Sequence, residues 1–286
     1  MTERETMRPI TLRRIIEVCS LVLQSNGLDT EMVSKRLNSS LSRAKEILSE
    51  VKRMNLVDVS QNLWVANSNT AKFLEYFENE EWDGMHQFFL DNYQFYREFI
   101  QILQNHLSDE WGLSMDEVTD ESVQRGLHLN RTSVEVLSDW CERLGVIQRN
   151  LYTARIYLVK RGEKDFEVFF RTLVKTYRRF SSSPWRREIF VEIPLIRESV
   201  CEELKISRED FDIMLKEIYL KNIGRIEFSG APITTHAKRS PLSEKKIKPV
   251  GKDAVMSAKS DLKKEREGLT INRKSYYYLA IHGINL

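Results

Sequence analysis

The sequence has 286 residues, of which 41% are hydrophobic and 30% are charged, and its formal net charge is +2. This length suits two or three domains, each with a small apolar core. No stretch reaches the roughly 20 apolar residues that a membrane-spanning helix needs, and the N-terminal Met-Thr-Glu-Arg-Glu-Thr has no apolar signal core. We therefore expect an intracellular protein of the cytoplasm, without a membrane partner.

The first part of the chain reads as three helices followed by a β-hairpin. Apolar residues at helical spacing predict a first helix over residues 11–25. Val33 and Leu37 lie one turn apart on a second helix, and Ser40, a preferred N-cap residue, begins a third. Two short runs of alternating apolar and polar residues flank Gln61-Asn62, which predicts a β-hairpin at this point.

The arrangement from Val33 onwards occurs three times. A 24-residue pattern that begins at Val33 recurs without a gap 90 residues later, at Val123, and again 77 residues after that, at Val200. Six of its positions are apolar in every copy, namely Val33/Val123/Val200, Leu37/Leu127/Leu204, Ala44/Val134/Phe211, Ile47/Leu137/Met214, Val51/Cys141/Ile218 and Leu56/Val146/Ile223. A seventh position holds the N-cap residues Ser40, Asn130 and Ser207. Each copy therefore predicts a helix, a tight turn and a capped second helix, which is the helix-turn-helix arrangement.

Aromatic residues gather between the first and second copies. Ten of them fall between residues 73 and 99, on what reads as two helices separated near Asp83-Gly84. From Lys72 to Glu121 the chain carries 13 acidic and 2 basic residues. A stacking platform for nucleic-acid bases needs positive charge around its rings. The segment 72–121 is therefore better interpreted as a helical connector whose rings pack between domains or against a protein partner or second protomer.

The second and third copies repeat the helix and the hairpin that flank the first. The predicted elements are helices over 85–106 and 166–180, and hairpins formed by 146–149 with 155–159 and by 224–229 with 275–281. The last hairpin thus carries an insertion of about 40 residues, far more than a usual hairpin loop. On its final strand, alternation predicts one buried and two exposed rings among Tyr276, Tyr277 and Tyr278.

Positive charge is concentrated towards the end of the chain. From Arg171 to Leu286 there are 24 basic and 15 acidic residues. Between His236 and Lys252, within the insertion, there is one acid, Glu244, and there are six basic residues: Lys238, Arg239, Lys245, Lys246, Lys248 and Lys252. A flexible basic wing of this composition suits contact with phosphates or entry into the minor groove. The alternative is a solvated loop that maintains solubility.

Three repeats of helix, helix-turn-helix and hairpin resemble the winged helix-turn-helix superfamily in a tandem, three-copy arrangement. The resemblance covers most of the chain, and it implies a mainly α fold with small β-hairpins. The expected domains are winged helices at 1–68, 85–162 and 163–286, with a helical connector at 69–84 and the wing insertion of the third domain at 230–270. Domains of this kind read DNA with the second helix of the helix-turn-helix, or dock on other proteins.

The second helices of the three copies differ in their outward residues. Helix 40–53 carries a basic and small polar mixture, suited to base edges and phosphates. The face of the second copy, taken to include Ser133 and Ser138, is mixed, whereas the third helix begins with Arg208-Glu209-Asp210 and is unsuited to a groove. The residues that we expect to contact DNA are Ser42, Arg43, Lys45 and Ser49 in the first copy, Arg131, Thr132, Arg149 and Arg155 in the second, and the six basic residues between His236 and Lys252.

No pattern in the sequence indicates catalysis. The lone Gly251-Lys252 lacks the upstream geometry of a phosphate-binding loop, and the five histidines show no H-x-x-x-H or C-x-x-C grouping. Cys19, Cys141 and Cys201 are widely spaced within predicted helices, which favours small buried hydrophobic residues in a reducing compartment. We expect a protein that is not an enzyme and that has no cofactor and no metal.

Two functions remain open. The first is a non-enzymatic DNA-binding protein, either a regulator or the DNA-contacting subunit of a larger complex, associated with the nucleoid. Helix 40–53 would enter a major groove of duplex DNA, the basic wing 236–252 would grip the backbone, and binding would weaken steeply with salt. The alternative is a protein-docking adaptor or scaffold subunit of a multi-protein chromosome-maintenance or genome-defence complex, with the acidic, aromatic segment as its partner surface.

Overall fold

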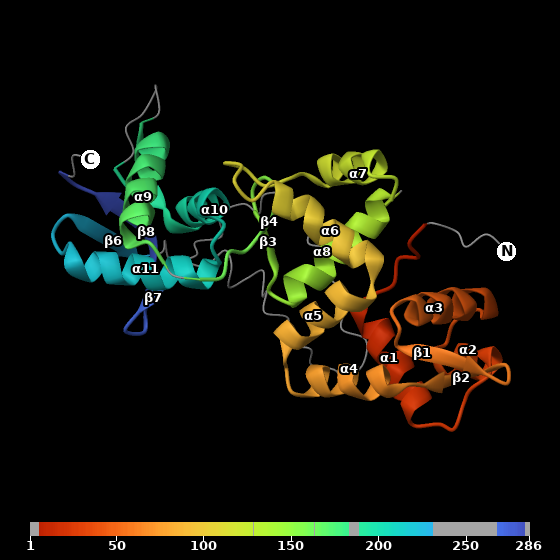
Figure 1. The fold of residues 1–286 in the computed structure, drawn as a ribbon. Helices are drawn as coiled ribbons and strands as arrows, with labels where there is room; N and C mark the ends of the chain where they lie inside the picture. The colour runs from red at the N-terminus through yellow and green to blue at the C-terminus, as the bar shows by residue number, and fades with distance from the viewer. Residues whose placement is uncertain (1–5, 128, 163, 183–188, 231–267, 284–286) are drawn as a thin grey trace. The chain divides into compact units, whose positions relative to one another are not determined.

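The computed structural model describes residues 6–127, 129–162, 164–182, 189–230 and 268–283 (Figure 1). Within these ranges the chain forms eleven helices and eight strands. The fold is therefore mainly helical with small antiparallel sheets, as the sequence predicts. The chain divides into two compact units, Met1–Val159 and Lys160–Leu286. Among the described helices none combines the length and the apolar character needed to span a bilayer.

The first copy folds into the predicted helices and hairpin. Its elements are α1 (Leu12–Leu23), α2 (Thr30–Arg36), α3 (Leu41–Arg53), β1 (Val57–Ser60) and β2 (Leu63–Ala66). The Ser40 hydroxyl accepts the backbone N–H of Arg43 at 3.2 Å and so caps α3. Gln61 and Asn62 take φ values of 50° and 63°, the backbone of a two-residue turn between antiparallel strands. All six matched apolar positions of this copy are buried.

Three helices, α4 (Ser68–Glu78), α5 (Trp82–Asn92) and α6 (Gln94–Asn105), span the predicted connector 69–84 and the helix predicted at 85–106, and we refer to all three as the connector. The break predicted near Asp83-Gly84 lies instead at residues 79–81. Gly84 is inside α5, where a Cβ atom would approach the ring of Tyr76 to 2.7 Å, so this glycine permits a close contact and does not end the helix. A second break at Tyr93 interrupts the predicted helix 85–106, because the extended backbone there (φ −130°, ψ 104°) turns the ring into the core.

The aromatic rings of the connector form much of the core of the first unit. Phe73, Phe89, Tyr96 and Phe99 are fully buried. The ring centroid of Phe89 lies 5.4 Å from that of Phe73, 5.3 Å from that of Tyr96 and 5.2 Å from that of Trp140, which comes from the second copy. The rings are thus packed between the first and second copies, as one of the two interpretations of this segment predicts.

The second copy departs from the repeat at one matched position. Its elements are α7 (Met115–Gln124), α8 (Arg131–Arg143), β3 (Ile147–Arg149) and β4 (Ile156–Leu158), and the Asn130 side chain caps α8 as predicted. Val123, expected in the core, is 50% exposed. Helix α7 ends before Gly126, which takes the left-handed φ of 77°, whereas α2 continues to the equivalent residue, Arg36. The shifted helix end rotates Val123 outwards, and Ser122 occupies the interior instead.

Two serines expected on the outer face of α8 are also buried. Ser138 has no exposed surface, and its hydroxyl donates to the carbonyl of Val134 at 2.7 Å. Ser133 is 1% exposed, and its hydroxyl donates to the side chain of Asn130 at 3.1 Å. These hydroxyls form hydrogen bonds within their own helix, so the small side chains can be buried without leaving a polar group unpaired. A prediction from polarity alone therefore places these two serines on the surface incorrectly.

The second unit contains α9 (Phe166–Ser181), β5 (Val191–Glu192), α10 (Ile193–Leu204), α11 (Arg208–Lys221), β6 (Ile226–Gly230), β7 (Leu269–Ile271) and β8 (Lys274–Ile281). The predicted long-range pairing is confirmed, since β6 and β8 are antiparallel from Ile226↔Ile281 to Gly230↔Tyr276. The side chain of Ser207 caps α11, again as predicted. Strands β5 and β7, which no sequence pattern indicated, also pair with β8.

The tyrosines of β8 do not alternate as expected, because all three are half-buried. The Tyr276 ring lies 5.7 Å from that of Phe228, between centroids. The Tyr277 hydroxyl donates to the carboxylate of Glu192 at 3.2 Å. The Tyr277 and Tyr278 rings also contact each other at a centroid distance of 5.1 Å, so none of the three rings is fully exposed.

In the third copy the matched residue Leu204 is half-buried, and Ile223 has 72% of its surface exposed. Helix α11 continues to Lys221, one residue beyond the equivalent of Arg53, where α3 ends. The interior position after the helix is then taken by Ile226, which is 2% exposed. A longer helix in the third copy therefore changes which residue enters the core.

All three copies share a backbone contact that the sequence pattern does not contain. In each copy the segment just before α2, α7 or α10 pairs with the last strand of the hairpin of the same copy, which is β2, β4 or β8. These antiparallel pairs are Leu28↔Trp64, Leu113↔Ile156 and Val191↔Leu279. Each copy therefore has a third short extended segment beside its predicted hairpin, which is an isolated bridge in the first two copies and strand β5 in the third.

Candidate nucleic-acid interface

Helix α3 presents three faces with different surroundings. Its apolar face is buried in the core and carries Ala44, Ile47, Leu48 and Val51. A second face, formed by Arg43, Glu46, Glu50 and Arg53, meets other parts of the first unit. The third face is exposed and carries Ser42, Lys45, Ser49 and Lys52. We call this third face the α3 outer face.

The second face holds the N-terminal segment and the connector against α3. The Arg43 guanidinium donates to the carbonyl of Pro9 at 2.7 Å and to Glu46 at 3.0 Å. The Glu50 carboxylate is fully buried, and it accepts hydrogen bonds from the Tyr93 hydroxyl and, at 3.3 Å, from the N–H of Arg8. Burial raises the pKa of Glu50, while its hydrogen bond from Tyr93 opposes this shift. Arg43, expected to contact DNA, thus has an intramolecular role in this structure.

The α3 outer face keeps the other three predicted residues of the first copy together. Ser42, Lys45, Ser49 and Lys52 follow one another at helical spacing, over a length of about 15 Å. Among the described residues, neither Lys45 nor Lys52 has an ion-pair partner. Lys35 and Arg36 at the end of α2 are exposed as well. This face therefore offers two lysine charges, without neutralising carboxylates, between small hydroxyl side chains.

The predicted basic residues of the second copy lie against carboxylates. Arg131 is 3.0 Å from Asp116, Arg149 is 2.9 Å from Glu142, and Arg155 is 3.2 Å from Glu117. The Arg155 guanidinium also donates to the carbonyl of Gly112 at 2.6 Å. Thr132 is exposed at the start of α8. Intramolecular pairing lowers the net charge that this copy can offer to a phosphate backbone.

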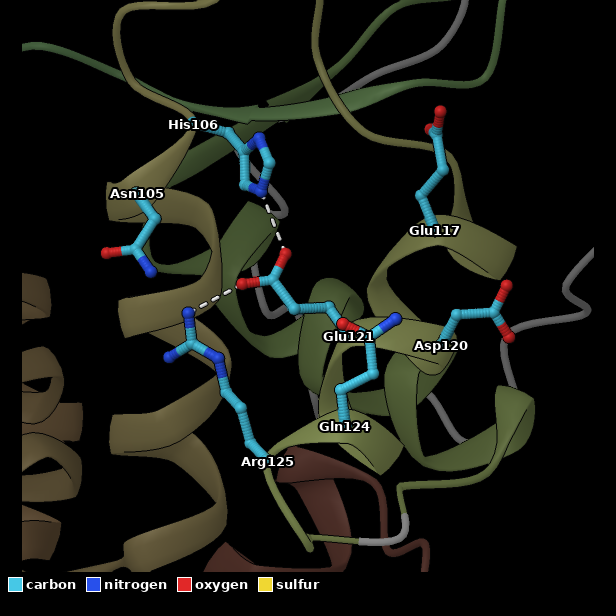
Figure 2. Close-up of a pocket in the computed structure, with 7 residues that line it drawn as sticks. All are labelled: Asn105, His106, Glu117, Asp120, Glu121, Gln124 and Arg125. Atoms are coloured by element: carbon cyan, nitrogen blue, oxygen red, sulfur yellow. Dashed lines mark hydrogen bonds and ion pairs between the residues drawn. The ribbon is translucent and has the colours of Figure 1, made fainter.

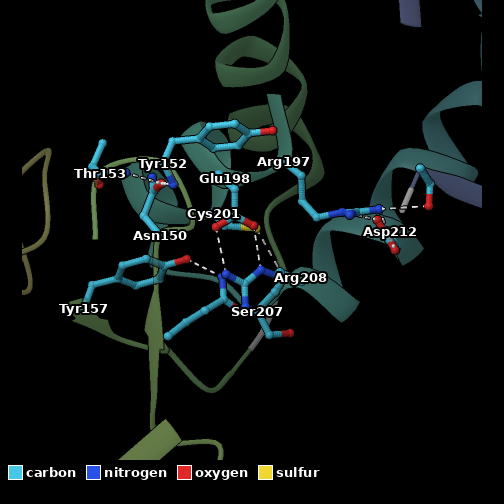
Figure 3. A network of polar contacts seen from close by, with 12 residues as sticks. Asn150, Tyr152, Thr153, Tyr157, Arg197, Glu198, Cys201, Ser207, Arg208 and Asp212 are labelled. Carbon is cyan, nitrogen blue, oxygen red and sulfur yellow. Dashed lines mark hydrogen bonds and ion pairs between the residues drawn. The ribbon is translucent and has the colours of Figure 1, made fainter. Parts of the chain in front are cut away.

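The polar residues of α11 are likewise engaged within the second unit (Figure 3). Arg208 makes a bidentate pair with Glu198 at 2.6 and 2.8 Å. Asp212 accepts two hydrogen bonds from Arg197, at 2.8 and 3.2 Å. The six predicted residues of the insertion, Lys238, Arg239, Lys245, Lys246, Lys248 and Lys252, lie outside the described residues. Of the predicted DNA-contacting residues that the structure describes, the largest group on one exposed face is therefore the one on α3.

A polar pocket in the first unit was not indicated by the sequence (Figure 2). The His106 ring lies between two carboxylates, with Nδ1 2.7 Å from Asp109 and Nε2 2.8 Å from Glu121. Glu121 also pairs with Arg125 at 2.5 Å. The hydrogen bond with Asp109 and the one with Glu121 raise the pKa of His106. The spacing of His106 and Asp109 was visible in the sequence, but Glu121 comes from a different helix and gave no signal.

We expect the first unit to lose stability as pH rises above about 6.5, because the His106 imidazolium pairs with both carboxylates. Its pKa in the folded chain lies above the ordinary 6.5. The contribution is therefore complete below 6.5 and is lost as pH rises through the folded pKa. The melting temperature of the intact chain, measured at several pH values, should fall over this range. His106→Gln should flatten that dependence, whereas His282→Gln, which changes a ring in the second unit, should leave it unchanged.

Metal ligands and thiols can be assessed for the described residues. None of them form a group of three or more histidine, cysteine, aspartate or glutamate side chains that could hold a metal ion. Cys19, Cys141 and Cys201 are free and buried, as predicted. Burial raises the pKa of the Cys19 thiol to about 12, which keeps it in the weakly reactive protonated form.

Comparison with protein-family models and with curated proteins gives no match for this sequence. The similarity that the structure does show is the one among its own three copies. The copies share the capped helix, the hairpin and the third short extended segment, and they differ in the residues that α3, α8 and α11 expose.

Proposed function

We propose that the protein is a non-enzymatic DNA-binding protein, a regulator or the DNA-contacting subunit of a larger complex, whose α3 outer face enters the major groove. The observation that carries this proposal is the row of Ser42, Lys45, Ser49 and Lys52 on a capped helix whose other faces are held by the core, the N-terminal segment and the connector. A helix fixed in this way presents its exposed residues with little loss of conformational freedom on binding.

The proposal includes a winged-helix fold for each copy. Support comes from the order of helix, short extended segment, helix, capped helix and hairpin, which is found three times. In domains of this type the second helix of the helix-turn-helix lies in the major groove and the hairpin lies beside it. Helix α3 and the β1–β2 hairpin take these places in the first copy.

The chemistry of the α3 outer face suits duplex DNA. Lysine ammonium groups neutralise phosphates and release counterions, while serine hydroxyls donate to or accept from base edges and phosphate oxygens. The amino-terminal end of α3, capped by Ser40, adds the positive end of the helix dipole. Lys35 and Arg36 extend the positive surface from the neighbouring helix.

The other copies take supporting roles in this proposal. The arginines of the second copy are paired with carboxylates, and α11 of the third copy carries acidic residues in its first turn, so neither helix competes with α3 for a groove. The basic residues of the insertion supply nonspecific contacts with the backbone. No catalytic step is part of the proposed function.

Replacing Lys45 and Lys52 together with alanine should weaken binding to duplex DNA by about tenfold or more near physiological salt, because two phosphate contacts are lost. The slope of the logarithm of the binding constant against the logarithm of salt concentration should become less steep by about 2. Fluorescence anisotropy with a labelled duplex, measured at several salt concentrations, gives both quantities.

The matched control is Arg13→Ala/Arg171→Ala, which also removes two exposed positive charges, each paired with a carboxylate. It should change the affinity by less than about threefold. A third variant neutralised at Lys245, Lys246 and Lys248 separates backbone contact by the insertion from contact by α3. Absence of binding by the intact chain at low salt, or equal losses in the first two variants, would contradict the proposal.

The structure gives less support to the alternative role as a protein-docking adaptor than to DNA binding. The segment 72–121 was expected to offer aromatic rings to a protein partner. Six of its rings, Phe73, Phe88, Phe89, Tyr93, Tyr96 and Phe99, are instead buried inside the first unit, whereas Trp82 is half-buried and Trp111 is 39% exposed. What this segment leaves on the surface is mainly carboxylate, which suits solubility as well as binding.

A further inference from the structure

An exposed apolar side chain lies at the amino-terminal end of the α3 outer face. Leu41 is the first residue of α3, and 41% of its surface is exposed. It precedes Lys45 by four residues, so the two side chains lie on the same side of the helix, one turn apart. Leu41 therefore borders the hydroxyl and ammonium groups of the α3 outer face.

The other two copies show that the fold does not require an apolar residue at this position. The residues equivalent to Leu41 are Arg131 and Arg208, and each is likewise the first residue of its helix. Both arginines pair with carboxylates of their own unit, Arg131 with Asp116 at 3.0 Å and Arg208 with Glu198 at 2.6 Å. Leu41 is thus not a core residue of the repeat, and its apolar side chain is particular to the copy that carries the α3 outer face.

The charges around Leu41 favour an anionic partner. The position of Lys45 holds Glu135 in the second copy and Asp212 in the third, so the positive charge is also particular to the first copy. The first turn of α3 contains no acidic residue, whereas that of α11 contains two. In the proposed function this anionic partner is duplex DNA, and the present inference rests on that function.

The major groove of DNA offers one kind of apolar group to such a side chain. The edges of guanine, adenine and cytosine present hydrogen-bond donors and acceptors, whereas thymine adds a 5-methyl group. Residues at the amino-terminal end of the second helix are the ones that contact base edges in helix-turn-helix proteins. The leucine side chain has no donor or acceptor, so packing it on a polar edge would leave that edge without its water partner. The thymine methyl group is therefore the base group that matches Leu41.

We propose that Leu41 is a specificity-determining residue, whose side chain packs on the 5-methyl group of a thymine in the major groove. Lys45 then contacts a neighbouring base or phosphate. The four residues that separate Leu41 from Lys45 span about 6 Å along the helix, or roughly two base-pair steps. The preferred DNA site thus contains a thymine within about two base pairs of the group that Lys45 contacts.

The methyl group can be tested by changing the DNA alone. Selection from a random duplex library with the intact chain gives the preferred site, which should contain a thymine at one fixed position. Replacing that thymine with deoxyuridine removes the methyl group and keeps the hydrogen-bonding edge. Binding should weaken about fourfold, as expected when one methyl group is no longer buried. Deoxyuridine in place of a thymine outside the site, in the same duplex, should leave the affinity unchanged.

Variants at Leu41 test whether this side chain causes the preference. Leu41→Gln should bind the thymine and deoxyuridine duplexes equally, whereas Leu41→Met, which remains apolar, should keep the preference. Val123→Gln, at an apolar residue that is 50% exposed on α7, should also keep it. The dependence of binding on salt should be the same for Leu41→Gln as for the intact chain, because no phosphate contact is lost. Circular dichroism confirms that each variant is folded.

Three results would overturn this inference and leave the proposed function standing. They are DNA binding without an enriched sequence, equal binding of the thymine and deoxyuridine duplexes by the intact chain, and a preference for thymine that persists in Leu41→Gln. Absence of DNA binding by the intact chain at low salt would overturn the proposed function and this inference together.

Discussion

Replacing Trp140 with alanine should lower the free energy of unfolding of the first unit by about 3–5 kcal/mol, the largest effect that we expect from a single substitution in this unit. Trp140 is fully buried, stacks on Phe89 at a centroid distance of 5.2 Å and lies 6.1 Å from the ring of Tyr93. The substitution removes the indole from the core, leaves a cavity and deprives the carbonyl of Ile10 of its donor.

Urea unfolding, followed by the fluorescence of Trp64 and Trp82, which remain in this unit, measures the decrease in the free energy of unfolding. The control is Trp111→Ala, at a tryptophan of the same unit that is 39% exposed. Because a partly exposed ring contributes less burial, this variant should cost clearly less than Trp140→Ala. Equal losses in the two variants would show that Trp140 does not hold the copies together.

Asp212→Asn should destabilise the second unit by about 2–3 kcal/mol, because it leaves the Arg197 guanidinium without its bidentate partner. Arg197 is 2% exposed, so water compensates little for the lost carboxylate. The Asp212 side chain is 30% exposed, so the expected loss is below the roughly 3–5 kcal/mol for breaking a fully buried pair. Hydrogen exchange of peptides from α10 and α11 measures the stability of this unit separately from that of the first unit.

A double-mutant cycle distinguishes the pair from general disruption. Arg197→Met and Asp212→Asn should together cost less than the sum of the two single losses, because either one already breaks the pair. Glu167→Gln, at an exposed pair with Arg171, should change stability by less than about 0.5 kcal/mol. Additive losses in the cycle would exclude a direct coupling between Arg197 and Asp212.

Local signals in the sequence predicted much of the fold. Ser40, Asn130 and Ser207 each cap a helix, because a short side chain before an apolar stripe satisfies a free N–H in a way that depends on neighbouring residues alone. Gln61-Asn62 forms the expected turn for the same reason. The pairing of β6 with β8 was visible because both runs alternate and no nearer partner exists for either.

The positions that were predicted wrongly depend on longer-range structure. Val123 and Ile223 are exposed because α7 ends earlier and α11 ends later than the first copy suggests. The break at Tyr93 occurs within a run that has good helical periodicity. It is favoured by the burial of the ring against Trp140, which lies 47 residues further along the chain. Periodicity within one segment contains no information about such contacts.

The sequence predicted only some features of the candidate site, because some depend on local periodicity and others on contacts with distant segments. Exposure of Ser42, Lys45 and Ser49 follows from the phase of α3, which the apolar residues define. The engagement of Arg43 by the carbonyl of Pro9 does not follow, because the N-terminal segment has no periodic pattern of its own. The pairing of Arg131, Arg149 and Arg155 with carboxylates likewise depends on how α7, α8 and the β3–β4 hairpin meet.

Tyr93 determines how the first unit can be divided. Its hydroxyl bonds to Glu50 of the first copy while its ring lies 6.1 Å from Trp140 of the second. A fragment that stops at Ala66 would keep the buried carboxylate of Glu50 but lose its hydroxyl donor, and a fragment that begins after Tyr93 would leave the indole of Trp140 without that cover. A piece of this unit that carries the α3 outer face and keeps the hydroxyl donor to Glu50 therefore extends at least through Tyr93.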